Sequence, residues 1–71
     1  MSIAKVIEIT SDSERSFEDA IQRGIAAAAA SVHNVRSAWV KEQQVVVNDN
    51  RISGYRVDLK VTFVVDDKSG R

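Results

Sequence analysis

The sequence contains no cysteine and no proline, and its 71 residues include one histidine, one tryptophan, one tyrosine and two phenylalanines. Without cysteine no disulfide can stabilise the fold, and a single histidine leaves few soft ligands for a structural metal. A chain this short forms one domain, which buries only about 60% of the surface that its unfolded chain exposes. We therefore expect a single domain over residues 1–71 that other subunits stabilise.

An excess of charge of one sign and a long apolar run are also missing. Ten basic and ten acidic residues give a formal net charge of zero, which argues against a protein that binds nucleic-acid phosphates or anionic lipid. The stretch from Met1 to Thr10 is short and charged, and the alanine run from Ala26 to Ala30 is too brief to span a bilayer. We expect a cytoplasmic protein with neither nucleic acid nor membrane among its partners.

The hydrophobic pattern predicts four elements. Ile3 to Ile9 is rich in β-branched residues and predicts a strand that ends at the polar "TSDSERS". A helix should run from about Phe17 to Val32 with Ser16 as its N-cap. Two long strands, roughly Arg36 to Val47 and Ile52 to Val65, are joined through "NDNR", which suits a tight turn. The predicted order is β-α-β-β, an α+β fold.

Both strands of the hairpin alternate between two kinds of side chain. In the second strand the apolar residues are Tyr55, Val57, Leu59, Val61 and Phe63, and the polar ones are Arg56, Asp58, Lys60 and Thr62. In the first strand Ala38 and Val40 alternate with Ser37, Trp39 and Lys41. One face of the hairpin should therefore be apolar and the other polar.

The helix carries an apolar stripe that narrows from large to small side chains: Phe17, Ile21, Gly24, Ala28 and Val32. The small residues favour close packing against a sheet or another chain. The high helix propensity of alanine explains the run equally well.

Length also predicts an oligomer. A helix of about 16 residues spans roughly 24 Å, whereas a strand of about 11 residues reaches roughly 37 Å. One helix cannot cover such a hairpin, so Val45 to Val47 would be left in water unless neighbouring subunits cover them.

The segments "KVIEI" (Lys5 to Ile9), "SFEDAI" (Ser16 to Ile21), "NVR" before the hairpin and "YRVDLKVTF" (Tyr55 to Phe63) resemble the dodecin family in order and spacing. The resemblance covers nearly the whole chain, from about Ala4 to Asp66. It implies a three-stranded antiparallel sheet partly wrapped around one helix, and a hollow homododecamer. It also implies a flavin (riboflavin, FMN or FAD), held in pairs at two-fold subunit contacts and stored, not used for catalysis.

The family's flavin site uses a Trp that stacks on the ring and a Gln that hydrogen-bonds its polar edge. An ungapped alignment places Ser37 at the Trp position and Arg56 at the Gln position, while Trp39 lies two residues later on the same face of the strand. Ser37, Trp39 and Arg56 are the candidate ligand-binding residues. Trp39 and Arg56 could form a rearranged site for a planar ligand, or Trp39 could pack across a subunit contact.

Other chemistry has weaker signals. His33 should serve the last carbonyls of the helix and its dipole. Oxygen ligands for a hard cation could come from Asp12, Glu14, Glu18, Asp19, the "NDN" turn, Asp66 and Asp67, although a solvated surface is the simpler interpretation. No nucleophile with a paired base is visible, so we do not expect an enzyme.

Two functions are therefore expected: flavin storage, or a flavin-free shell that is structural or binds a cation such as calcium.

Overall fold

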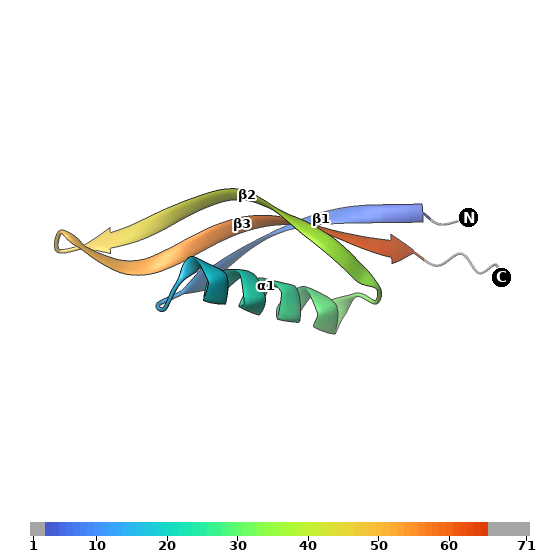
Figure 1. The fold of residues 1–71 in the computed structure, drawn as a ribbon, viewed down its shortest axis with the longest axis horizontal. Helices are drawn as coiled ribbons and strands as arrows, with labels where there is room; N and C mark the ends of the chain where they lie inside the picture. Colours follow the sequence, from blue (N-terminus) through green and yellow to red (C-terminus); the bar gives the residue numbers. More distant parts are fainter. Residues whose placement is uncertain (1–2, 66–71) are drawn as a thin grey trace.

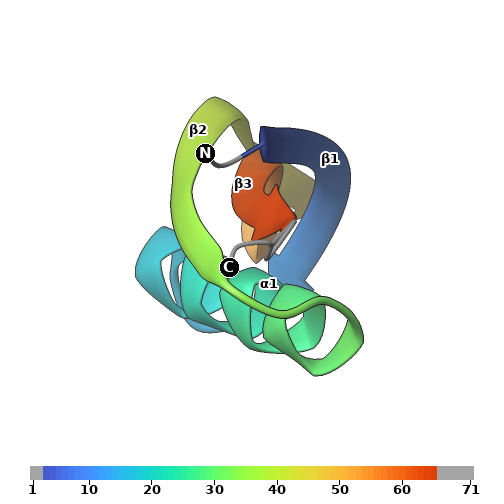
Figure 2. The same cartoon turned by 90° about the vertical axis from the view of Figure 1, so that its right-hand side faces the viewer.

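A computed structural model describes residues 3–65, which form one helix on a three-stranded antiparallel sheet (Figure 1). The elements are β1 (Ile3–Ser13), α1 (Phe17–Ser31), β2 (Val35–Asn48) and β3 (Arg51–Val65). The sheet order is β1-β3-β2, so β3 is the central strand. Viewed along its length, the sheet curves partly around α1 (Figure 2), which contacts all three strands. The predicted β-α-β-β fold is confirmed.

The core lies between α1 and the concave face of the sheet. Its fully buried members come from the helix and from the alternating apolar positions of the central strand: Ala20, Ala28, Val57, Leu59 and Val61. Gly24 lets the helix approach most closely, because a Cβ atom there would lie 2.7 Å from Leu59 Cδ1. Ala26, Ala27, Ala29 and Ala30 are exposed. Close packing therefore explains Gly24, Ala20 and Ala28, and helix propensity explains the exposed alanines.

The helix begins as predicted. The Ser16 hydroxyl accepts a hydrogen bond from the Asp19 backbone N–H at 2.9 Å, which satisfies one of the free amides of the first turn. The prediction for His33 was wrong, because α1 ends at Ser31 and the Val32 N–H donates to the Ala28 carbonyl. No hydrogen bond found within residues 3–65 involves the His33 side chain.

β1 is four residues longer than predicted, because its polar end pairs with β3. Ser11, Asp12 and Ser13 lie opposite Val57, Arg56 and Tyr55. Ser13 is buried, and its hydroxyl donates to the Asp19 carboxylate at 2.6 Å. Long-range pairing thus overrides the polar composition that suggested an earlier end.

The hairpin extends well beyond the helix (Figure 1). Asp49 and Asn50 form its two-residue turn with φ angles of 52° and 63°, as in the type I′ turns that suit Asp and Asn. At this end Val47 and Ile52 are each 56% exposed. The predicted overhang with uncovered apolar side chains is confirmed. Within residues 3–65 no helix has the length and apolar character needed to cross a membrane.

Candidate functional site

The face of the sheet that points away from α1, here called the outer face, carries the predicted site residues. Val57, Leu59 and Val61 face the helix, so the alternating residues of β3 between them face outward. Residues paired across antiparallel strands share a face. Ser37 lies opposite Thr62, and Trp39 lies opposite Lys60. Arg56 lies between Gln44 of β2 and Asp12 of β1.

Trp39 is the most exposed large apolar side chain in the described part of the chain, at 75%. Phe17 and Tyr55, which meet edge to face at 5.1 Å, form the one aromatic pair found among residues 3–65. Trp39 therefore has no role in this chain's own core. Its indole is accessible to a ligand or to another subunit.

Arg56 is held by Asp12. Its Nε donates to Asp12 Oδ1 at 2.7 Å and its second terminal nitrogen donates to Oδ2 at 3.2 Å. The hydrogen bonds, and then the charge of the partner, lower the pKa of Asp12 and raise that of Arg56. Both side chains are well exposed, so solvent screens this pair.

The structure brings the three predicted site residues onto one face but not to one point. Arg56 is four residues along β3 from Lys60, the partner of Trp39, which places it about 13 Å from Trp39 along the strand. Ser37 is on the far side of Trp39 from Arg56. Within one chain, Trp39 and Arg56 are therefore not direct neighbours on this face.

A carboxyl pair on the outer face was missed by the sequence reasoning. Lys41 Nζ lies 3.1 Å from Glu8 Oε2 and 4.0 Å from Asp58 Oδ2. Lys41 is the extra residue of a β-bulge between Val40 and Glu42. The alternation of polar residues along β1 and β3 placed Glu8 and Asp58 on polar positions, but only the register of the strands brings them together.

The two carboxyl groups shift each other's pKa in opposite directions. The hydrogen bond to Glu8, followed by burial, raises the pKa of Asp58, while the same hydrogen bond and then Lys41 lower the pKa of Glu8. Asp58 Oδ1 is shielded from solvent and has no hydrogen-bond partner within residues 3–65. The outer face thus holds a carboxyl group with a raised pKa, two residues along β3 from Lys60, the partner of Trp39.

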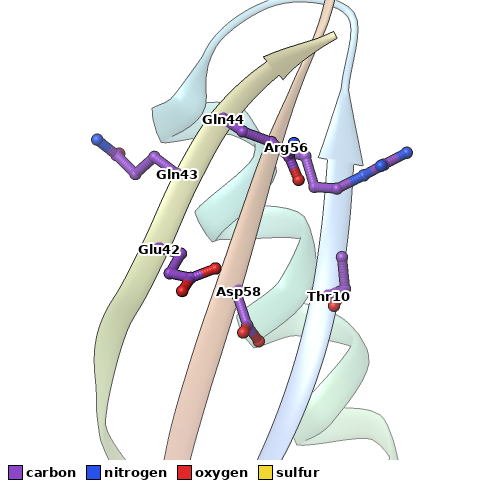
Figure 3. A pocket seen from close by; sticks show the side chains of 6 residues that line it. All are labelled: Thr10, Glu42, Gln43, Gln44, Arg56 and Asp58. Atoms are coloured by element: carbon purple, nitrogen blue, oxygen red, sulfur yellow. The ribbon is translucent and has the colours of Figure 1, made fainter.

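A shallow polar hollow of about 110 Å³ lies beside Arg56 (Figure 3). In Figure 3 the Arg56 side chain reaches across β1, Gln44 leans toward Arg56, and Gln43 points away from the sheet. The side chains that line the hollow are Thr10, Glu42, Gln43, Gln44, Arg56 and Asp58. Its polar lining suits a polar or charged part of a ligand more than an aromatic ring.

The candidate cation ligands do not gather at one place in the described part of the chain. Asp12 is bound to Arg56, and Asp19 accepts hydrogen bonds from Ser13 and Arg23. Within residues 3–65, no group of three or more acidic, histidine or cysteine side chains could hold a metal ion. Asp66 and Asp67 lie outside the described residues.

A family model named Dodecin matches residues 3–66. The chain belongs to the dodecin family. The resemblance found in the sequence is thereby confirmed, and the curved sheet around one helix is the dodecin fold.

Individual dodecins are similar over most of their length. The calcium dodecin of Mycobacterium tuberculosis (strain ATCC 25618 / H37Rv) is 38% identical over 63 residues, which are 89% of each chain. The structure of a dodecin from Streptomyces davaonensis is 31% identical with a TM-score of 0.87, covering 92% of this chain and 96% of its own. A Thermus thermophilus dodecin variant is 28% identical with a TM-score of 0.86, covering 92% and 97%.

Proposed function

We propose that this dodecin is a homododecameric protein that binds and stores a flavin on the outer face of its sheet, in the cytoplasm and without catalysis. The observation that carries the proposal is the 75% exposed indole of Trp39. It lies on the same face as Ser37, the position that aligns with the family's stacking Trp, and about 7 Å further along the strand. Trp39 offers the flat apolar surface that an isoalloxazine ring needs.

The overhanging hairpin supports the assembly. Val45, Val47 and Ile52 are exposed where α1 no longer covers the sheet, and β1 and β2 are both edge strands. A domain of this size needs further burial for stability. Light scattering of the purified protein should show one species of about twelve chains, in keeping with the family. A stable folded monomer at micromolar concentration would contradict this assembly.

Titration of flavin into the purified protein tests the ligand, with quenching of flavin emission as the readout. Stacking on an aromatic side chain is worth about 1–3 kcal/mol in analogous sites, so Trp39→Ala should weaken binding by about one to two decades. Glu18→Ala, on the exposed surface of the helix, is the control and should leave the affinity unchanged.

Restoring the family pair gives a second test. Ser37→Trp with Arg56→Gln should strengthen flavin binding, because it adds a stacking face and an amide that can both donate and accept. Equal flavin affinity in the wild type, this double variant and Trp39→Ala would exclude the outer face as the flavin site.

Calcium is the second candidate ligand, in a shell that holds no flavin. A relative that is 38% identical is named calcium dodecin. Asp58 Oδ1, which has no hydrogen-bond partner among residues 3–65, lies on the same face as Glu8 and Glu42. Lys41 disfavours a cation at this place, because its own ammonium group is positively charged and already donates a hydrogen bond to the Glu8 carboxylate. Calorimetry with Ca²⁺ tests this candidate. Two results together would favour calcium over flavin. The purified protein is colourless and does not bind added flavin, and it gives a heat of Ca²⁺ binding that Asp58→Asn abolishes.

A further inference from the structure

Three charged side chains, one from each strand, meet on the outer face of the sheet: Glu8 from β1, Lys41 from β2 and Asp58 from β3. Lys41 lies between the two carboxyl groups, with its Nζ 3.1 Å from Glu8 Oε2 and 4.0 Å from Asp58 Oδ2. Because β3 is the central strand, the contact with Glu8 links the two edge strands across it. We call these three residues the charged cluster.

The cluster is built on the β-bulge of β2. Pairing with β3 stops at Val40 and resumes at Glu42, opposite Asp58, so Lys41 has no partner in the ladder. Bulges disrupt the ladder locally and redirect a side chain. The long side chain of Lys41 thus has two carboxyl groups within reach, and in this structure it donates a hydrogen bond to only one of them, Glu8.

The observed arrangement fits a neutral Asp58 and an ionised Glu8. Two ionised carboxylates repel each other at hydrogen-bond distance, whereas a protonated Asp58 can donate to Glu8. This hydrogen bond, followed by burial, raises the pKa of Asp58. Asp58 Oδ1 is also shielded from solvent and has no hydrogen-bond partner within residues 3–65, which disfavours a charge on this side chain.

Ionisation of Asp58 leaves the charges around it unbalanced. The charged groups that face it from the three strands are Glu8, Lys41, Glu42, Arg56 and Lys60. α1 lies on the opposite face of the sheet, and the Arg56 guanidinium is bound to Asp12. Three carboxylates then face two ammonium groups. Because Lys41 already lies 4.0 Å from Asp58, a charge on Asp58 should attract it.

We propose that the charged cluster is a pH-sensitive switch, in which Lys41 binds Glu8 while Asp58 carries a proton and moves to Asp58 once Asp58 has ionised. In the first state Lys41 links β2 to β1 across the sheet, and in the second it links β2 to β3 alone. The change occurs as pH rises through the raised pKa of Asp58. Trp39 lies two residues before Lys41 in β2, so whatever covers its indole rests next to the switch. The inference does not depend on the identity of that ligand or subunit.

A double-mutant cycle measures the interaction between Lys41 and Glu8, with urea unfolding as the assay. Lys41→Met and Glu8→Gln remove the charges and keep the side chains close to their original length. At about pH 4.5, the ordinary value for a glutamate, the interaction should change the unfolding constant about two- to fivefold, the upper range for an exposed ion pair. At about pH 7 this factor should fall toward one, because Lys41 has moved to Asp58.

The same cycle in the Asp58→Asn background isolates the switch. Asparagine cannot ionise and can still donate an N–H to Glu8. The factor should therefore stay at about two- to fivefold at both pH values. A purely structural role of Asp58 would not remove the pH dependence of an interaction between two other residues.

Asp49→Asn is the matched control background. It makes the same chemical change in the hairpin turn, away from the charged cluster, where Asp49 has a φ of 52° that asparagine tolerates. In this background the Lys41–Glu8 factor should fall with rising pH as it does in the wild type.

Circular dichroism and light scattering establish that each variant folds and assembles alike at both pH values, and Asp58→Ser provides a second uncharged residue should the asparagine variant fail. The inference is overturned if the wild-type factor is the same at both pH values. It is also overturned if the factor falls in the Asp58→Asn background as it does in the wild type. These outcomes leave flavin storage standing, and an absence of flavin binding leaves the switch standing.

Discussion

Replacing Gly24 by alanine tests how closely the helix lies against the sheet. The added methyl would lie 2.7 Å from Leu59 Cδ1 and 3.2 Å from Ser11 Cβ. Leu59 is fully buried, so its terminal methyl cannot turn away without displacing other core atoms. Ser11 Cβ belongs to the paired part of β1 and moves only with the strand.

Two effects of opposite sign decide the change in stability. An extra methyl in a tightly packed core costs about 1–3 kcal/mol. Alanine in place of glycine within a helix contributes about 1 kcal/mol in the other direction. We expect the overpacking to prevail, so that Gly24→Ala lowers the free energy of unfolding by about 1 kcal/mol.

Urea unfolding followed by circular dichroism measures this change, with all proteins at one concentration so that any contribution of self-association is the same for each. Leu59→Val removes both δ carbons and with them the closest contact. The double variant should therefore be more stable than the sum of the two single effects predicts, by about 0.5 kcal/mol or more. If Gly24→Ala is instead about 1 kcal/mol more stable than the wild type, as helix propensity alone predicts, the close approach is refuted.

Two further variants test local contacts. Ser16→Ala should lower the free energy of unfolding by about 1 kcal/mol through loss of the hydrogen bond from the Asp19 N–H; an unchanged urea midpoint would show that the cap is not needed. The raised pKa of Asp58 means that the wild type loses stability as pH rises from the ordinary value of 3.8 through the raised one. Asp58→Asn does not ionise, so it should be more stable than the wild type at pH 7 and approach it in acid. Parallel pH profiles of the two proteins would contradict the raised pKa of Asp58.

The hairpin could be predicted from the sequence because its signals are local. The alternation from Tyr55 to Phe63 has the period of a strand with one buried face, and three of its apolar residues, Val57, Leu59 and Val61, are buried in the observed core. Asn48, Asp49 and Asn50 are suited to a turn with positive φ, and two of them adopt it. In this part of the chain, the alternation of side chains and the residue types in the turn both predict a hairpin.

The end of β1 and the carboxyl pair could not be predicted, because they depend on contacts distant in the sequence. Ser13 is in the sheet because it pairs with Tyr55 and donates to Asp19. Glu8 meets Asp58 only through the register of β1 on β3, and the bulge at Lys41 adds the cation. No short segment of the sequence contains both partners of these contacts, so local patterns cannot predict them.

The period of the strand explains how a dodecin can have its exposed tryptophan at Trp39 with the fold unchanged. A shift of one residue along β2 would turn the indole toward the helix side, where Ala38 lies against the core. A shift of two residues keeps the indole on the outer face, opposite Lys60 instead of Thr62. The core and the outer face are therefore separate sets of residues on the same strands. Residues of the outer face, such as Trp39 and Arg56, can therefore change while the packing of α1 on the sheet stays as it is.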